Sequence, residues 1–227
     1  MVEEAESTFG PIYMLVNCAG FAKAAKFEDV SEAACRSMMD VNFLGSFFLT
    51  QEVVRRMKSA DVGGIIVFVS SAGGLFGVFG YTAYAAAKGA LVKFAEALHM
   101  ELKPYDISVT VNYPPDTDTP GFAEENKTKP VETGLISESA GLFKTEDVAK
   151  ALIEDSLHGK FSSSVGLEGF MLATMCAGMS PVTDLFSVVS QIFLSGVFRF
   201  VSLFYLWNFA RIVSAEREKR LLSKKEE

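Results

Sequence analysis

The chain has 227 residues, enough for one sizeable domain with a buried core, and its formal net charge of −7 argues against a nucleic-acid partner. Its three cysteines, Cys18, Cys35 and Cys176, are scattered without metal-site or redox spacing and indicate reduced thiols. The two histidines are far apart in the sequence, which argues against a histidine-ligated metal site or a Ser-His-Asp triad.

The first half of the chain alternates short apolar runs with longer helical patterns. Residues 12–17 and 64–69 are apolar runs that predict buried parallel strands. Between them, residues 31–58 have helical spacing, with Ser31 placed to cap the helix. The Ala-rich segment 81–103 predicts another helix, which ends near a proline. This alternation predicts an α/β fold with a parallel sheet.

A third predicted strand leads into a polar stretch. Residues 107–111 are mostly β-branched and precede a Pro-Pro pair, which cannot continue a central strand. Residues 116–138 are rich in charge, Gly and Pro, and they predict a long loop. Thr145 then opens a helix of about a dozen residues, with acidic residues near its positively polarised end.

The segment Tyr84-Ala-Ala-Ala-Lys88 places a phenol and an amine on the same face of a helix. A phenol has a pKa of about 10, and a neighbouring ammonium favours the phenolate, so we expect Lys88 to lower the pKa of Tyr84 toward neutrality. Ser71 lies thirteen residues before Tyr84, at the end of a predicted strand, with Ser70 as an alternative. Two hydroxyls that converge on one point suit a ketone or alkoxide oxygen. The pattern therefore predicts carbonyl reduction or alcohol oxidation, with hydride from a cofactor.

In this order and spacing, these residues resemble the short-chain dehydrogenase/reductase family over roughly residues 9 to 160. Asn17-Cys18-Ala19-Gly20 is similar to that family's Asn-Asn-Ala-Gly segment, and Asn42 to its helix asparagine. Residues 114–121 lie where the family has a Pro-Gly turn and a threonine. The resemblance implies a Rossmann-like, doubly wound parallel sheet that binds NADPH.

The resemblance also implies a role for each residue. Tyr84 gives its proton to the carbonyl oxygen, Lys88 holds the nicotinamide ribose, and Ser71 or Ser70 donates a hydrogen bond to the substrate oxygen. Asn42 anchors a water that relays protons to Lys88. The implied cofactor-binding residues are Asn17, Ala19, Gly20, Tyr84, Lys88, Pro114, Thr117 and Thr119. The alternatives are a tight strand-to-loop turn at residues 17–20 and turn hydroxyls at the two threonines.

The family's glycine-rich phosphate turn has no match in this chain. Gly73-Gly74-x-x-Gly77 follows the serine pair and is instead the predicted turn into helix 81–103. The resemblance therefore implies an N-terminal truncation that removes the first βαβ units. Strand 12–17 would then be an exposed apolar edge, and we expect the chain alone to bind a dinucleotide weakly.

The C-terminal third is strongly apolar, and Arg199 interrupts two uncharged stretches, residues 185–198 and 200–210. A single span over 185–210 would place Arg199 near the bilayer centre, at a cost of about 2.5–3.5 kcal/mol. The i, i+3, i+4 spacing of the apolar residues from Leu185 to Phe193 instead suits a helix that lies in the membrane interface. Both interpretations make membrane lipid a partner, and the sequence leaves them open. The alternative to membrane association is a helix that packs within a soluble protein.

These patterns divide the chain into a partial reductase domain (1–164), a membrane-associating hydrophobic region (165–214) and a basic tail (215–227). Positive residues beside an apolar segment favour the cytosolic side of a membrane. The end of the chain, Lys224-Lys225-Glu226-Glu227, resembles a dilysine retrieval signal of the endoplasmic reticulum. We therefore expect the protein at the endoplasmic reticulum membrane, with its active site facing the cytosol.

Residues 113–122, 124–130 and 178–182 resemble the branch of the family that reduces 3-ketodihydrosphingosine. This resemblance implies NADPH-dependent reduction of a long-chain sphingoid ketone. One alternative is another membrane-bound reductase of the family, acting on steroid, retinoid or fatty-acyl ketones. The other is a non-catalytic fragment that binds membrane or the full-length enzyme. The sequence leaves the oligomeric state open, a homo-oligomer included.

Overall fold

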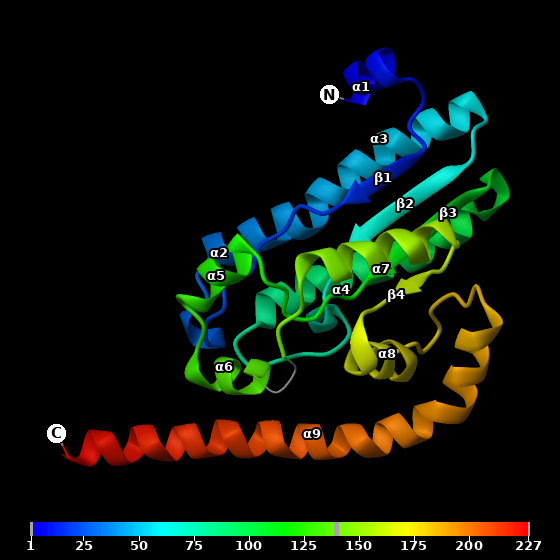
Figure 1. The fold of residues 1–227 in the computed structure, drawn as a ribbon. Helices are drawn as coiled ribbons and strands as arrows, with labels where there is room; N and C mark the ends of the chain where they lie inside the picture. The colour runs from blue at the N-terminus through cyan, green and yellow to red at the C-terminus, as the bar shows by residue number, and fades with distance from the viewer. Residues whose placement is uncertain (1, 139–140, 227) are drawn as a thin grey trace.

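Within residues 2–138 and 141–226, which the computed structural model describes, a four-stranded parallel sheet forms the centre of the protein (Figure 1). Its order is β1-β2-β3-β4, and the register pairs Val16 with Val67 and Val67 with Thr110. The strands are β1 (Met14–Asn17), β2 (Gly64–Val69), β3 (Ile107–Asn112) and β4 (Ser162–Ser163). The predicted parallel α/β fold is confirmed.

Helices cover both faces of the sheet, as in a doubly wound fold. On one face, Ile66 and Phe68 join the core formed with α3 and α4. On the other face, Leu152 of α7 packs against Ile65 and Val67. Because successive residues of a strand point to opposite faces, the uninterrupted apolar run of β2 is buried between two helical layers. The helices are α1 (Val2–Phe9), α2 (Glu32–Met39), α3 (Gly45–Ala60), α4 (Thr82–Leu102), α5 (Pro120–Asn126), α6 (Val131–Ser137), α7 (Thr145–Leu157), α8 (Gly166–Met175) and α9 (Leu185–Glu226).

The helix predicted over residues 31–58 forms two helices, α2 and α3, joined by a π-helical turn at Asp40–Leu44. The predicted cap is confirmed, because Ser31 Oγ accepts a hydrogen bond from Ala34 N at 3.2 Å. The π turn carries Asn42, which is fully buried. Single π turns inside helices often occur at functional sites.

The prediction of a loop over residues 116–138 is wrong in part, because α5 and α6 lie within it. Thr119 caps α5, since Phe122 N donates to Thr119 Oγ1 at 3.1 Å. α6 is held by tertiary contact, as Thr133 Oγ1 donates to Phe79 O at 2.8 Å. Short helices of this kind are stabilised by packing more than by their own sequence, so their polar composition concealed them.

The expectation that β1 lies at an edge of the sheet is confirmed, because the described residues place no strand on its outer side. Val16 in this strand and Tyr13 just before it are 38% and 62% exposed. β4 was not predicted, because two serines carry no alternating or apolar signal. It joins the opposite edge through two residue pairs with β3.

α9 runs beneath the domain, past α8 and α6 (Figure 1). Near its start, the ring of Phe170 of α8 lies 5.7 Å from that of Phe186 and 5.9 Å from that of Phe198. Near its end, Arg220 Nη1 lies 2.5 Å from Glu132 Oε1 of α6. The domain boundary that the sequence analysis places after residue 214 falls inside this helix.

Candidate active site

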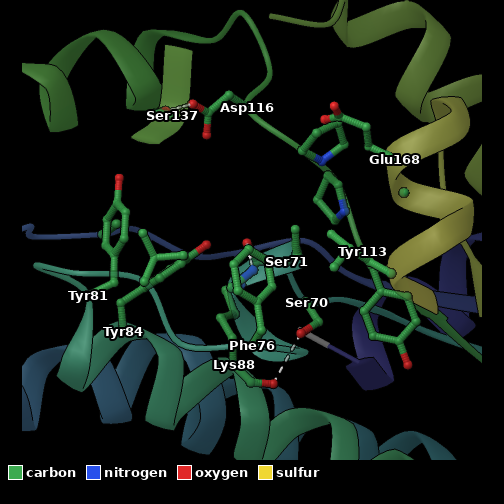
Figure 2. A pocket seen from close by; sticks show the side chains of 18 of the residues that line it. Ser70, Ser71, Phe76, Tyr81, Tyr84, Lys88, Tyr113, Asp116, Ser137 and Glu168 are labelled. Atoms are coloured by element: carbon green, nitrogen blue, oxygen red, sulfur yellow. Dashed lines mark hydrogen bonds between the residues drawn. The ribbon is translucent and has the colours of Figure 1, made fainter. Parts of the chain in front are cut away.

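A cavity of about 490 Å³ opens where β2 and β3 end (Figure 2). Ligands of open α/β sheets bind at the carboxyl ends of the strands, and the volume lies within the range of small-molecule sites. α8 and α9 provide an apolar wall, to which Met171, Leu172, Phe198 and Phe209 contribute. The cavity therefore combines the polar ends of two strands with a largely apolar wall from the C-terminal third of the chain.

Tyr84, in the first turn of α4, and Ser71, just after β2, face the same part of the cavity (Figure 2). The Ser71 hydroxyl donates a hydrogen bond to the Tyr84 phenol oxygen. Ser71 Oγ also accepts from Gly73 N at 3.1 Å, which fixes its position. The structure thus brings together the two hydroxyl groups that the sequence analysis placed at one point.

Ser70 has a different environment from Ser71. Its hydroxyl donates to the Lys88 carbonyl oxygen at 3.0 Å, and the residue is 2% exposed. Gly74 is required at this contact, because a Cβ there would lie 2.5 Å from Ser70 Oγ and 3.1 Å from the Lys88 backbone. Ser70 therefore joins the end of β2 to α4, whereas Ser71 faces the phenol.

Lys88 is 4% exposed, and its Nζ donates to Val69 O at 2.9 Å and lies 5.9 Å from the centre of the Tyr84 ring. Burial lowers the pKa of Lys88 to about 8, because the low-dielectric interior disfavours the ammonium. A Cβ at Gly20 would lie 3.0 Å from Lys88 Nζ and 2.7 Å from Asn42 Oδ1. Only glycine therefore fits where this loop meets the amine.

The prediction that Lys88 lowers the pKa of Tyr84 toward neutrality is wrong for this structure. Burial raises the pKa of Tyr84 to about 12, although the hydrogen bond from Ser71 acts in the opposite direction. The carboxylates of Glu125 and Asp116 raise this pKa further. Desolvation of the phenolate is the largest cause of this shift, and burial also disfavours the charged form of the Lys88 amine. Tyr84 is consequently a neutral phenol at pH 7.

Asn42 ties the loop after β1 to the π turn. Its Nδ2 donates to Phe21 O and Met38 O, both at 2.9 Å, and its Oδ1 accepts from Phe21 N at 3.1 Å. These three hydrogen bonds hold the loop in the position that brings Gly20 against Lys88. The water that the family resemblance assigns to Asn42 stays a prediction.

The predicted cofactor segment at residues 17–20 contributes unevenly to the cavity. Cys18 and Gly20 line it, whereas Asn17 and Ala19 do not. Asn17 Nδ2 donates to Thr50 Oγ1 at 3.0 Å and to Val67 O at 3.3 Å, away from the cavity. The side chain of Asn17 therefore stabilises the strand end, which corresponds to the structural alternative for this residue.

Pro114, Thr117 and Thr119 all line the cavity. Pro114 O accepts from Ala72 N at 3.1 Å, which joins the loops that follow β2 and β3. Thr117 Oγ1 donates to the Pro115 carbonyl at 2.9 Å, and Thr119 Oγ1 caps α5. Both hydroxyls thus make local turn or cap contacts, in line with the alternative that these threonines are turn hydroxyls.

Sequence reasoning missed several charged or polar side chains that line the cavity. Asp116 and Glu125 come from the segment expected to be a loop, and Glu168 and Tyr205 come from α8 and α9. Neither motif nor spacing marks these residues, because they meet only through tertiary contacts. Asp116 directly follows the Pro-Pro pair, and this position at the end of a parallel strand is the one signal that could have found it.

Among solved structures, the fold is similar to that of a short-chain dehydrogenase from Streptomyces avermitilis. The TM-score is 0.62 at 23% identity, over 87% of this chain and 74% of the other. A 4-hydroxyisoleucine dehydrogenase complexed with NADH gives a TM-score of 0.59 at 21% identity, over 72% of this chain and 71% of the other. At these identities the similarity shows the fold alone.

Curated relatives are more similar in sequence. A 3-dehydrosphinganine reductase of Danio rerio is 52% identical over 213 residues, which cover 94% of this chain and 64% of that protein. A 3-ketodihydrosphingosine reductase of Bos taurus is 48% identical with the same coverage. The chain thus spans slightly less than two thirds of the length of these relatives.

The short chain dehydrogenase family profile matches residues 1–130, more than half of the chain. The matched region contains the whole Ser71, Tyr84 and Lys88 arrangement and the loops that surround it. Together with the parallel sheet, this match shows that the chain belongs to the short-chain dehydrogenase family.

Proposed function

We propose that this chain carries the proton-donating and substrate-binding part of an NADPH-dependent 3-ketodihydrosphingosine reductase, which acts in sphingolipid biosynthesis. The observation that carries the proposal is one cavity in which Ser71 and Tyr84 face an apolar wall built by α8 and α9. Such a cavity suits a ketone on a long alkyl chain. The identity of 48–52% to reductases of this substrate supports the assignment.

Tyr84 donates its phenolic proton to the carbonyl oxygen. The neutral phenol is the form required for reduction, and with a pKa of about 12 Tyr84 holds its proton at pH 7. The Ser71 hydroxyl, which donates to the phenol before the ketone binds, turns to the substrate oxygen and stabilises the negative charge that develops there. The geometry favours Ser71 over Ser70 for this role, because Ser70 is buried against α4.

The residues around Lys88 fit the nicotinamide end of a dinucleotide. An ammonium has three N–H donors, and Lys88 Nζ gives one to Val69 O while lining the cavity. The other donors can serve ribose hydroxyls, and the absence of a side chain at Gly20 leaves room for the amine itself beside Asn42. The bound cofactor would supply the hydride. The choice of NADPH over NADH rests on the resemblance to this branch of the family.

The function is tested by turnover in the full-length protein. We expect NADPH-dependent reduction of 3-ketodihydrosphingosine and much slower reduction of a steroid ketone, because the apolar wall suits a flexible alkyl chain. Absorbance at the nicotinamide band measures both rates. Preference for the steroid would favour another membrane-bound reductase, and the absence of any NADPH oxidation would favour a non-catalytic role.

We further propose that α9 lies in the surface of the endoplasmic reticulum membrane, with the domain on the cytosolic side. The inner face of α9 lines the cavity. On the same helix, Arg220 forms an ion pair with Glu132 of α6, whose side chain is 1% exposed. The outer face of α9 carries large exposed apolar side chains, and only 6% of the most apolar 18-residue stretch of this helix is buried. They are Phe186, Ile192, Phe193, Val197, Phe200, Leu203, Phe204 and Trp207. A spanning helix would have to leave the cavity wall and break the ion pair, so the structure favours the interfacial arrangement.

Charging the outer face of α9 is expected to release the protein from lipid. Phe200→Glu combined with Phe204→Glu should lower binding to phosphatidylcholine vesicles by about tenfold or more, because carboxylates are costly in the membrane interface. Flotation of the full-length protein with vesicles measures the bound fraction. Met100→Glu, at an exposed apolar residue on α4, is the matched control. Unchanged flotation of the double variant would contradict the proposed arrangement.

A further inference from the structure

Three carboxylates line the cavity, and they differ in what neutralises them. Glu125 accepts a hydrogen bond from the Tyr81 hydroxyl, and its Oε1 lies 3.2 Å from Lys129 Nζ. The Lys129 side chain is 6% exposed, so this ion pair is well shielded from water. The negative charge of Glu125 is therefore balanced inside the protein.

Glu168 lies in α8, where Tyr205 of α9 donates to its Oε1 at 3.2 Å. The carboxylates that act on the pKa of Tyr84 are Glu125 and Asp116, and Glu168 is not among them. Glu168 therefore belongs to the wall between α8 and α9.

Asp116 lines the same cavity as Tyr84 and forms no ion pair among the residues that the structure describes, although Lys88 and Arg199 also line this cavity. Asp116 lies four residues beyond the end of β3, faces the cavity, and accepts a hydrogen bond at Oδ2 from the Ser137 hydroxyl (Figure 2). Its backbone is also fixed, since Phe143 N donates to Asp116 O at 2.9 Å. Over the part of the chain that the structure describes, no lysine or arginine forms an ion pair with this carboxylate. A positioned carboxylate that lines the same cavity as a proton donor and has no ion-pair partner is suited to a cationic ligand.

We propose that Asp116 selects ketones that carry an ammonium group beside the carbonyl, by pairing with that group while Ser71 and Tyr84 hold the carbonyl oxygen. This inference rests on the proposed function, because a sphingoid 3-ketone has its amine on the carbon next to the carbonyl. The ammonium then balances the carboxylate that raises the pKa of Tyr84, and this eases transfer of the phenolic proton. Asp116 thus recognises the substrate head, and the wall of α8 and α9 receives its alkyl chain.

The test compares two ketones in the full-length protein with NADPH: 3-ketodihydrosphingosine and its analogue without the amine, 1-hydroxyoctadecan-3-one. Asp116→Asn keeps the size of the side chain and an acceptor for Ser137 but removes the charge. We expect kcat/KM for the amino ketone to fall by about 10- to 100-fold, as for loss of a charged hydrogen bond. For the amine-free ketone we expect no loss, since no charge pairs there and removal of the carboxylate lowers the pKa of Tyr84.

Glu168→Gln is the matched control, because it removes a cavity carboxylate that is hydrogen-bonded to Tyr205 in the wall of α8 and α9. It should leave the ratio of the two kcat/KM values unchanged. Ser137→Ala provides a second variant, which keeps the charge of Asp116 but removes the hydrogen bond that orients it. It should lower the ratio of kcat/KM for the amino ketone to kcat/KM for the amine-free ketone, but by less than Asp116→Asn does. Equal losses on both ketones, or no loss on the amino ketone, would overturn the inference and leave the proposed function standing. Failure of the unmodified protein to reduce the amino ketone would overturn both.

Discussion

Replacing Tyr84 by Phe in the full-length protein is expected to lower ketone reduction by about 10²- to 10⁴-fold, the range for loss of a general acid. The variant removes the one phenol that is hydrogen-bonded to Ser71 and keeps the ring, whose centre lies 5.6 Å from that of Tyr81. Packing and the Lys88 amine are preserved, so cofactor affinity should be retained. Turnover of 3-ketodihydrosphingosine and a fluorescence titration with NADPH measure the two quantities.

Tyr81→Phe is the matched control for that experiment. Tyr81 lines the same cavity, but its hydroxyl donates to Glu125. Its loss should reduce turnover far less than the loss of the Tyr84 hydroxyl. If Tyr84→Phe kept normal turnover, or if the two variants lost activity equally, Tyr84 would not be the proton donor.

Replacing Lys88 by Met is expected to abolish activity and to stabilise the fold at pH 7. Burial lowers the pKa of Lys88 to about 8 from an ordinary 10.5, and at 1.36 kcal/mol per pH unit this difference corresponds to about 3 kcal/mol. Loss of the hydrogen bond to Val69 O destabilises the variant by about 1 kcal/mol. We therefore expect a net gain in unfolding free energy of about 2 kcal/mol. Urea denaturation of the full-length protein measures it.

The lowered pKa of Lys88 also determines whether the stability of the fold rises or falls with pH. Because the pKa of Lys88 is lower in the folded state, the unfolded chain binds more protons between pH 8 and 10.5. The contribution of Lys88 to stability therefore rises as pH rises through this window, and the advantage of Lys88→Met should shrink at pH 10. A variant less stable than the unmodified protein at pH 7 would show that Lys88 contributes more through its contacts than burial of its charge costs.

Much of the fold was predictable because its signals are local. β2 and β3 agree with their apolar runs to within one residue, since β-branched side chains suit a strand buried on both faces. The helix start at Ser31 was predictable for a similar reason, because the cap lies three residues from the amide that it binds. α5, α6 and β4 were missed, since the contacts that stabilise them come from distant segments, such as Phe79 against Thr133.

The candidate site was likewise predictable only where its signals are local. The sequence placed Tyr84 and Lys88 on one helix face and offered Ser71 and Ser70 as alternatives. The structure separates the serines, because the turn after β2 directs Ser71 to the phenol and Ser70 to the backbone of α4. The direction of the Tyr84 pKa shift was wrong, because desolvation depends on everything packed around the ring, including Asp116 and Glu125.

The sequence by itself determined the family, the parallel α/β layers and the residues that bear the chemistry, because each depends on spacing within one strand or one helical turn. Only the tertiary structure decided how the cavity is closed, which carboxylates reach the proton donor and which face of α9 stays apolar and exposed. These features join residues that lie far apart in the chain, such as Glu132 and Arg220. Contacts at such separations arise from packing of the whole fold, and no local pattern of residues encodes them.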